Sequence, residues 1–298
     1  MQKEIMIYGL IALLILWIYI EQRLLMTKKY RVKSDVSGQT GFVLLADLHN
    51  RTFGAENHRL IKRIDSLKPD FIVMAGDIIN KKAASYPGNA YTLLDKLSDK
   101  YKIIYAYGNH EQRMEQIGKT SVTELTKEEQ YFYQSWIEFK NKLSKKGVIF
   151  LDNESIVMEC KGGRLRITGA SIDAEYFGFH TKQEMNPEYL PSLLGQSTKK
   201  EYQLLIAHNP VFFKNYTEWG ADLILSGHLH GGMMRLPGIG GVLSPQAKFF
   251  PKYDSGKHEY RKSQLIVSRG LGSHSIMPRI FNIPELVYVE LDRDMNTN

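Results

Sequence analysis

Residues 222–232 read DLILSGHLHGG, an apolar run that ends in two histidines placed between glycines. A short run of β-branched and large apolar residues bounded by turn-forming residues is typical of a buried strand. The same layout recurs in four other stretches of the chain, residues 41–50, 71–80, 102–111 and 202–210. Each of the five predicted strands runs directly into a loop rich in Asp, Asn, His and Gly, so these polar residues are expected at strand ends.

Helical patterns lie between the predicted strands. One apolar set recurs at helical spacing and stops before Pro69, namely Leu60, Ile61, Ile64 and Leu67. A second helix is predicted to begin at a capping box of Ser121 and Glu124 and to end near Gly147, with an apolar stripe of Phe132, Trp136, Phe139 and Leu143. Residues 164–170 and 285–291 are further predicted strands. The fold class is therefore α/β, with packed β-sheets flanked by helices.

The amino terminus is predicted to be a membrane anchor. Residues 5–20, IMIYGLIALLILWIYI, carry no charge, and flanking Lys3 and Arg23 can extend the run to the length that spans a bilayer. A cleaved signal peptide and a buried core helix are the alternatives, although no small-residue cleavage pattern follows the run. We expect residues 1–33 to form an anchor with a basic juxtamembrane segment. Residues 34–298, which contain no repeat or linker, are expected to form one catalytic domain.

The distribution of charge bears on orientation and on partners. Five basic residues follow the apolar run and only Lys3 precedes it, so the positive-inside rule places the large domain in the cytoplasm. An extracytoplasmic domain stays open, because many proteins with one amino-terminal helix export their domain. Residues 1–33 account for four of the seven net positive charges, so a nucleic-acid partner is not expected. The single cysteine, Cys160, excludes an internal disulfide.

The five loops together predict a metal centre. They hold five of the nine histidines, and burying several imidazoles and carboxylates without a common partner is costly. Side chains two residues apart on an extended segment point the same way, so two such pairs are expected to reach one site. The candidate residues are Asp47, His49, Asp77, Asn109, His110, His208, His228 and His230. Carboxylate, amide and imidazole ligands suit manganese, iron or zinc. The other four histidines (His58, His180, His258 and His274) are expected at the surface.

The blocks DLH, GD, GNHE, a lone histidine at a strand end, and GHLH resemble, in order and spacing, the calcineurin-like metallophosphoesterase family. They span residues 47–230. The later stretches MMRLPGIGGVLSPQ, FFPKYDSG and VSRGLG are similar to a membrane-associated bacterial branch of that family. The resemblance implies two β-sheets in a four-layer sandwich and an enzyme that hydrolyses phosphoesters.

The resemblance also implies roles for individual residues. Asp47, His49 and His230 would bind one divalent ion, and Asn109, His208 and His228 the other, with Asp77 between them. Manganese is the expected metal, with iron and zinc as alternatives. His110, adjacent to Asn109, is placed to hydrogen-bond the phosphoryl group or to protonate the leaving oxygen in an in-line displacement at phosphorus, and we expect it to be the acid. Arg269 is a weaker candidate for binding the substrate anion.

The substrate is less well defined by the sequence. Residues 233–242 form an apolar, glycine-rich segment directly after two predicted ligands, which together with the anchor favours a phosphodiester or pyrophosphate bond in a membrane-associated, lipid-linked substrate. A loop packed on the domain's own core is the alternative reading of this segment. Soluble nucleotides or nucleic acid are the alternative substrates. A non-catalytic binding module is the other functional class, and the presence of all seven ligands argues against it.

Overall fold

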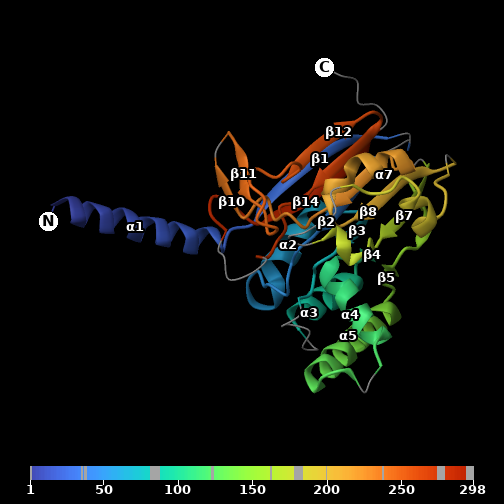
Figure 1. Ribbon diagram of the computed structural model, residues 1–298, viewed down its shortest axis with the longest axis horizontal. Coiled ribbons are helices and arrows are strands. Elements are labelled where there is room, and N and C mark those ends of the chain that lie inside the picture. The colour runs from blue at the N-terminus through green and yellow to red at the C-terminus, as the bar shows by residue number, and fades with distance from the viewer. Residues whose placement is uncertain are drawn as a thin grey trace.

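The computed structural model describes residues 2–34, 36, 39–80, 88–121, 124–161, 163–177, 184–198, 200–236, 238–273 and 279–292. Two six-stranded mixed sheets pack face to face, with helices on both outer faces (Figure 1). A separate two-stranded hairpin, β10 (Met234–Leu236) and β11 (Gly240–Leu243), lies outside both sheets. The predicted α/β class with two packed sheets and flanking helices is confirmed.

The first sheet has the strand order β1-β14-β2-β3-β4-β5. Its strands are β1 (Met26–Lys33), β2 (Thr40–Leu45), β3 (Phe71–Ala75), β4 (Ile103–Ala106), β5 (Ile149–Leu151) and β14 (Glu285–Asp292). The second sheet has the order β12-β13-β9-β8-β7-β6. Its strands are β6 (Ser155–Cys160), β7 (Gly163–Ala170), β8 (Tyr202–Ala207), β9 (Leu223–Ser226), β12 (Gly256–Tyr260) and β13 (Ser263–Val267).

The central strands of both sheets run parallel to their neighbours. In the first sheet β2, β3, β4 and β5 are parallel, and in the second sheet β7, β8, β9 and β13 are parallel. Parallel strands need crossover connections, which are usually helices. The α-helices are α1 (Gln2–Glu21), α2 (His58–Leu67), α3 (Asn89–Ser98), α4 (Asn109–Lys119), α5 (Lys127–Lys145), α6 (Tyr189–Leu194) and α7 (Phe213–Trp219). Short 3-10 turns are η1 (Ala55–Asn57), η4 (Ala174–Tyr176) and η5 (Pro210–Phe212).

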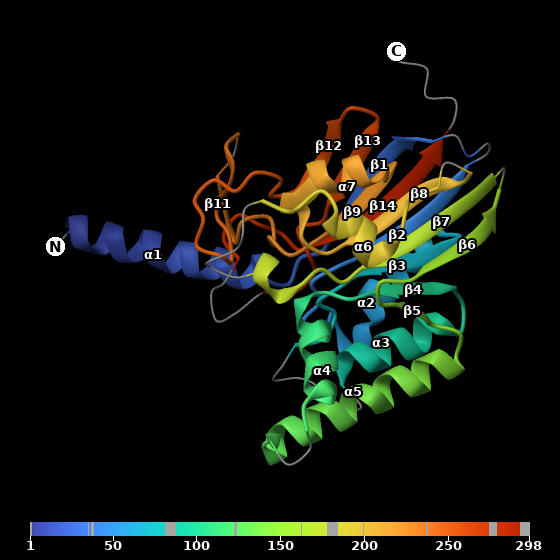
Figure 2. The same ribbon diagram turned by 45° about the vertical axis from the view of Figure 1, so that its right-hand side comes forward.

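The apolar runs are continuous because both faces of each central strand are buried. On β2, Phe42 and Leu44 point into the layer between the sheets, while Val43 and Leu45 pack with the helices that cover the outer face. The helices α2, α3 and α5 lie on that outer face, and α6 and α7 cover the second sheet (Figure 2). The result is the expected four-layer arrangement of helices, sheet, sheet and helices.

The second predicted helix begins later than expected. The helix α5 starts at Lys127, and its capping box is formed by Thr126 and Glu129 rather than by Ser121 and Glu124. Thr126 Oγ1 accepts a hydrogen bond from Glu129 N at 3.2 Å, and Glu129 Oε2 accepts one from Thr126 N at 3.0 Å. Two Ser/Thr-x-x-Glu patterns occur five residues apart, and only the second directly precedes the apolar stripe that packs on the sheet.

The expected boundary at residue 33 cuts through the first sheet. Residues 26–33, assigned from the sequence to a basic juxtamembrane segment, form β1, which pairs in parallel with β14 over its whole length. Lys28, Lys29, Arg31 and Lys33 are compatible with a strand because this edge strand has one solvent-facing side. The basic segment is therefore part of the globular domain.

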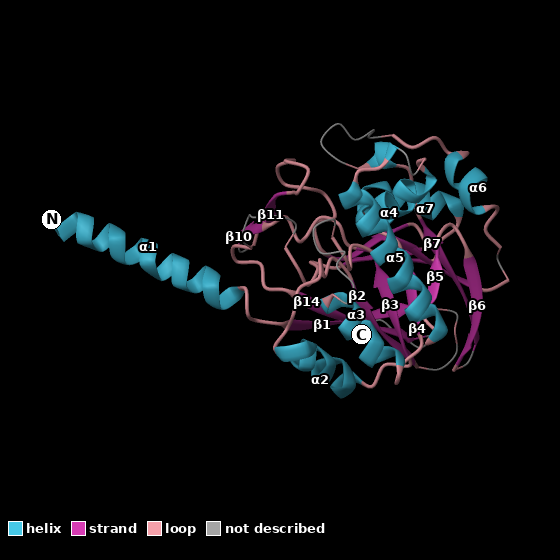
Figure 3. Ribbon diagram, turned by 90° about the horizontal axis from the view of Figure 1, so that it is seen from below, coloured by secondary structure: helices cyan, strands magenta, loops and turns pink. Residues whose placement is uncertain are grey.

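The helix α1 projects away from the rest of the molecule (Figures 1 and 3). It is the one described helix that is long and apolar enough to cross a membrane, and 6% of its apolar window is buried. A core helix would be mostly covered by other residues, so the buried-helix alternative does not describe α1. A membrane anchor and a signal sequence both remain compatible with an exposed apolar helix at this end.

Candidate metal centre

The polar residues that follow five strands converge where the two sheets meet. The loops after β2, β3 and β4 come from the first sheet, and those after β8 and β9 come from the second. Three groups of side chains there could hold a metal ion, each with its ligand atoms within 4.8 Å of one another. They are Asp47, His49 and His230; His49, Asp77 and His110; and Asp77, His208 and His228.

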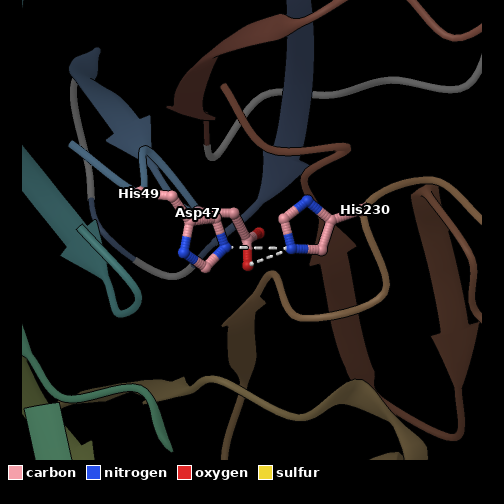
Figure 4. Close-up of side chains that lie close together, drawn as sticks. All are labelled: Asp47, His49 and His230. Atoms are coloured by element: carbon pink, nitrogen blue, oxygen red, sulfur yellow. Dashed lines mark hydrogen bonds and ion pairs between the residues drawn. The ribbon is translucent and has the colours of Figure 1, made fainter. Parts of the chain in front are cut away.

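The first group joins the loops after β2 and β9. The Nε2 atoms of His49 and His230 lie 3.1 Å apart with nearly parallel rings, and His230 Nε2 is 3.4 Å from Asp47 Oδ1 (Figure 4). All three side chains are buried. Three potential ligand atoms facing one small volume form a natural cation site.

The group of Asp77, His208 and His228 joins the loops after β3, β8 and β9. Asp77 Oδ2 lies 3.2 Å from His208 Nε2, and His208 Nδ1 donates to the Ala75 carbonyl oxygen at 2.6 Å. Because a carbonyl oxygen only accepts, the Nδ1 atom carries the proton and Nε2 is left with a lone pair for a metal. This contact gives His208 the tautomer that a ligand needs.

The donor set fits divalent metal ions. Asp77 Oδ2, Asn109 Oδ1 and His208 Nε2 are buried and complete no hydrogen bond of good geometry among the residues that the structure describes. Buried polar atoms are normally paired, and an unpaired one destabilises the fold. All three atoms belong to residues that the sequence predicts as ligands. Two divalent ions would supply the missing partners.

The backbone at these ligands differs from the predicted extended geometry. Asp47, His49, Asp77, His228 and His230 have φ values of 51°, 48°, 53°, 71° and 50°. These values lie in the left-handed region, which residues other than glycine seldom adopt. Residues with such strained backbone cluster at functional sites. The reason is that β2 and β9 have already ended at Leu45 and Ser226. The paired side chains converge through turns, not through the alternation of a strand.

Two glycines are required by close approach of the carboxylates. A Cβ at Gly108 would lie 2.3 Å from Asp77 Oδ1, and a Cβ at Gly227 would lie 2.4 Å from Asp47 Oδ2. The same carboxylates accept hydrogen bonds from backbone beside these glycines, Asp77 from His110 N at 3.0 Å and Asp47 from His228 N at 3.0 Å. The glycines therefore let the loops of neighbouring strands close on the two aspartates.

Glu111 was not singled out from the sequence, although it ends the GNHE block. Its fully buried carboxylate accepts hydrogen bonds from the backbone of the Asp77 loop and of Gly108, and from the Tyr105 hydroxyl. The donors are Asp77 N (2.8 Å), Ile78 N (2.9 Å), Ile79 N (3.2 Å), Gly108 N (2.9 Å) and Tyr105 Oη (2.7 Å). Glu111 thus holds the ends of β3 and β4 in register.

Arg279 and Asn282 support His230 from the other side. Arg279 is fully buried, donates to the carbonyl oxygens of Gly272 and Arg269 at 2.8 and 2.7 Å, and places a guanidinium nitrogen 3.4 Å from His230 Nδ1. Asn282 donates to the His230 carbonyl oxygen at 2.6 Å. No sequence pattern marks these two residues, because they lie about fifty positions from the histidine that they contact.

Gln246 is a further residue that sequence analysis missed. Its buried side-chain amide lies 2.9 Å from His228 Nε2. Phe177 packs edge-on against the His228 ring at 5.1 Å between centroids. The amide and the aromatic ring form the wall of the site on the side of the second sheet.

His110 and Arg269 occupy different positions relative to the clusters. His110 Nε2 lies 3.9 Å from Asp77 Oδ2, its ring meets His49 edge-on, and its side chain is partly exposed. It therefore borders the site from the solvent side. The Arg269 guanidinium instead lies 3.5 Å from Glu285 and lines a cavity of about 520 Å³ beside the β10–β11 hairpin.

Burial and mutual charge shift the pKa values within the clusters. Burial raises the pKa of Asp47, and Asp77 adds to the rise, while His208 opposes it. Burial alone would raise the pKa of Asp77 and lower that of His208, but their attraction prevails, so the pKa of Asp77 is lowered and that of His208 is raised. Burial lowers the pKa of Arg279 to about 9. Without metal, the two aspartates favour a second proton on the His208 imidazole, at Nε2, which a bound metal would displace.

The histidines outside the blocks lie away from the site. His58 is exposed at the start of α2, as expected. His258 is half-buried on β12, where it packs against Tyr253, so the expectation of a surface position is only partly met. His180 and His274 lie outside the described residues.

Comparison with known proteins relates the centre to a family. Residues 41–232 match the sequence model of calcineurin-like phosphoesterases. The uncharacterized metallophosphoesterase YkuE of Bacillus subtilis is 26% identical over 281 residues, covering 92% of this chain and 87% of YkuE. Phosphodiesterase YaeI of Escherichia coli shares 32% identity over 89 residues, which cover 30% of this chain and 32% of YaeI.

Solved structures give a weaker likeness. The phosphopantetheinyl hydrolase PptH from Mycobacterium tuberculosis aligns with a TM-score of 0.45 at 14% identity, covering 78% of this chain and 89% of that chain. The matched family region begins in β2 and ends at Gly232, so it contains all eight candidate residues of the metal centre.

Proposed function

The chain belongs to the calcineurin-like phosphoesterase family and is a phosphoric ester hydrolase. We propose that it uses two divalent metal ions to cleave a phosphodiester or pyrophosphate bond in a lipid-linked substrate. The observation that carries the metal assignment is a set of three buried ligand atoms, Asp77 Oδ2, Asn109 Oδ1 and His208 Nε2, which complete no hydrogen bond of good geometry within the described part of the chain. They lie where five strand ends from two sheets meet.

The proposed ligands divide between two ions. Asp47, His49 and His230 hold the first, as their mutual approach supports. Asn109, His208 and His228 hold the second. Asp77 lies between both, since its carboxylate belongs to one group with His49 and to another with His208. Oxygen and imidazole ligands without cysteine favour manganese, with iron and zinc as alternatives.

The bound ions supply Lewis-acid stabilisation of negative charge on a phosphoryl group and favour deprotonation of water at neutral pH. The protein supplies the remaining chemistry. His110 lies at the open side of the clusters, with Nε2 3.9 Å from Asp77 Oδ2. From this position Nε2 protonates the leaving oxygen. Glu111 and Arg279 keep Asp77 and His230 oriented through their hydrogen bonds.

The region beside the hairpin supports a lipid-linked substrate. The cavity of about 520 Å³ is lined by Arg235 and Arg269, which pair with Asp254 and Glu285, together with apolar Leu236, Ile239 and Phe281. Cationic and apolar groups on one cavity wall suit an anion attached to a hydrocarbon chain. The role of Arg269 is thus to bind a substrate phosphate. Its backbone is held in place because its carbonyl oxygen accepts a hydrogen bond from Arg279.

The membrane attachment of this function rests on α1. Its exposed apolar surface and position near the amino terminus support a single-pass anchor in the cell membrane. Five basic residues follow the apolar run at residues 5–20 and one, Lys3, precedes it, which favours a cytoplasmic catalytic domain. The extracytoplasmic orientation is the alternative, and accessibility of residue 152 to a membrane-impermeant reagent in an Asp152→Cys, Cys160→Ser chain distinguishes the two in intact cells.

The first test is hydrolysis by the purified full chain. Bis-p-nitrophenyl phosphate and a phospholipid diester in vesicles are incubated with Mn²⁺, Fe²⁺, Zn²⁺ or a chelator, beside Asp77→Ala and the exposed matched control Asp152→Ala. We expect metal-dependent turnover that is lost in Asp77→Ala and kept in Asp152→Ala. Equal activity with chelator, or full activity of Asp77→Ala, would contradict the metal mechanism. Turnover of soluble nucleotides with none of any lipid phosphoester would contradict the substrate class.

A further inference from the structure

Exposed apolar side chains gather at one place on the globular domain. Outside α1, eight large apolar side chains are exposed among the described residues, and six of them lie on or beside the β10–β11 hairpin. We name these six the apolar rim, namely Met234, Leu236, Ile239, Phe249, Phe250 and Phe281. Ile239, Phe249 and Phe250 are 65%, 72% and 61% exposed. A contiguous exposed apolar patch of this kind marks a surface that meets a partner or a membrane.

Backbone contacts hold the apolar rim together. The strand β10 pairs with β11, and Arg235 N donates to the Ile280 carbonyl oxygen at 3.0 Å, which places Phe281 beside β10. Phe250 N donates to the Val242 carbonyl oxygen at 2.9 Å, and Phe249 bridges to Leu243. Segments 234–236, 238–243, 249–250 and 280–281 therefore form one surface.

The apolar rim is continuous with the base of α1. The Trp17 and Phe281 rings pack with centroids 6.3 Å apart, and Phe281 N donates to Glu21 Oε2 at 2.8 Å. All three views show the hairpin beside the end of α1 where the helix joins the domain (Figures 1, 2 and 3). Trp17 lies about 6 Å along the helix axis from Glu21 at the usual helical rise. Phe281 thus sits at the level of the last turn of α1.

From this arrangement we infer that the apolar rim is a second membrane contact, which inserts at the lipid headgroup level beside α1. A bilayer that contains α1 must end near its last turn, where Trp17 and Tyr19 match the aromatic residues found at membrane interfaces. The rim lies at that depth and on that side. Exposed Arg23 and Lys252 flank it and complement anionic lipids.

This contact orients the metal centre toward the bilayer. The loop after β11 carries Gln246 to within 2.9 Å of His228, and Asn282, next to Phe281, donates to the carbonyl oxygens of His230 and Met233. The rim and the clusters thus share the same two segments. Resting on the proposed function, this places the entrance of the site where a lipid-linked phosphoester arrives from the membrane plane.

The depth of the rim is measured in the full chain, reconstituted in vesicles of phosphatidylethanolamine and phosphatidylglycerol. Single cysteines, Ile239→Cys on the rim and Tyr131→Cys on α5 as the exposed apolar control, are introduced with Cys160→Ser and labelled with an environment-sensitive fluorophore. Lipids carrying a nitroxide near the headgroup should quench residue 239 several-fold more than residue 131. Because α1 anchors both variants, the two sites can be compared directly. Equally weak quenching at residues 239 and 131, as for fluorophores in water, would overturn the inference.

A second measurement keeps surface and function apart. The double variant Phe249→Asp, Phe250→Asp should lower hydrolysis of a vesicle phosphodiester about tenfold and leave bis-p-nitrophenyl phosphate turnover within about twofold, with Tyr131→Asp as control. Equal losses on both substrates would contradict the membrane role. Quenching needs no turnover, so an inactive protein that is quenched at residue 239 defeats the proposed function alone. If residue 239 were buried without lipid and the protein had twice the mass of one chain, the apolar rim would instead be an interface with a second copy of the chain.

Discussion

At the scale of single residues, one buried carboxylate joins the two loops that present Asp77 and Asn109. Glu111 accepts from the backbone of both loops, and none of its acceptor positions faces solvent. A carboxylate is needed because every group around it donates. The amide of a glutamine would turn its own N–H toward backbone donors and leave some of them unpaired.

Glu111→Gln is therefore expected to lower the free energy of unfolding by about 2–3 kcal/mol and to reduce bound metal. Thermal unfolding and metal content of the purified protein measure both effects. Glu115→Gln, on the same helix and paired with Lys140 and Trp136, is the matched control and should keep its metal. A Glu111→Gln protein with normal metal content would show that the Asp77 loop holds its shape without this carboxylate.

The role of His110 predicts a dependence on the leaving group. If His110 protonates the leaving oxygen, His110→Ala should lose about 10²–10⁴ in kcat on an alkyl phosphodiester and much less on a nitrophenyl ester, whose leaving group needs no proton. Metal content should be unchanged, and His258→Ala serves as the control. Equal losses on both esters would instead assign His110 to binding the phosphoryl group.

At the scale of elements, the start of α5 can be tested by comparing its two candidate capping residues. Thr126 caps α5 with its side chain, whereas the predicted cap Ser121 lies before the helix. Thr126→Ala should lower the free energy of unfolding by about 1 kcal/mol, and Ser121→Ala by less than about 0.5 kcal/mol. Urea unfolding of the two variants makes the comparison, and the reverse order of effects would restore the sequence-based start.

The elements also explain how far sequence reasoning reached. All five strand ends were predictable because each combines an apolar run with a loop that carries histidine, aspartate or asparagine. The capping box was not, since two identical local patterns compete and only packing of Phe132 and Trp136 on the sheet selects one. The strand β1 was missed because Lys28, Lys29 and Arg31 are charged and exposed, and its pairing partner, β14, lies at the other end of the chain.

At the scale of the whole molecule, metal binding is coupled to protons. In the metal-free protein the pKa of His208 is raised by Asp77 and Asp47, so its imidazole stays protonated at neutral pH. A ligand imidazole must be neutral, and binding therefore releases this proton. The metal affinity should therefore rise with pH between about pH 6 and 8, below the raised pKa of His208 of about 10. Calorimetry of Mn²⁺ binding in buffers of different ionisation enthalpy measures the released protons, and their absence would contradict the coupling.

The sequence by itself determined the class of fold, the order of the strand ends and the apolar character of α1, and it predicted eight candidate residues for the metal centre, because each depends on a local pattern of a few neighbouring residues. Tertiary structure alone decided which of these residues meet. His49 and His230, 181 positions apart, approach to 3.1 Å only because two sheets pack face to face with their strand ends together. The supports from Glu111, Arg279 and Gln246, and the position of the apolar rim beside α1, follow from the same packing. Contacts between distant segments leave no periodic signal in either segment.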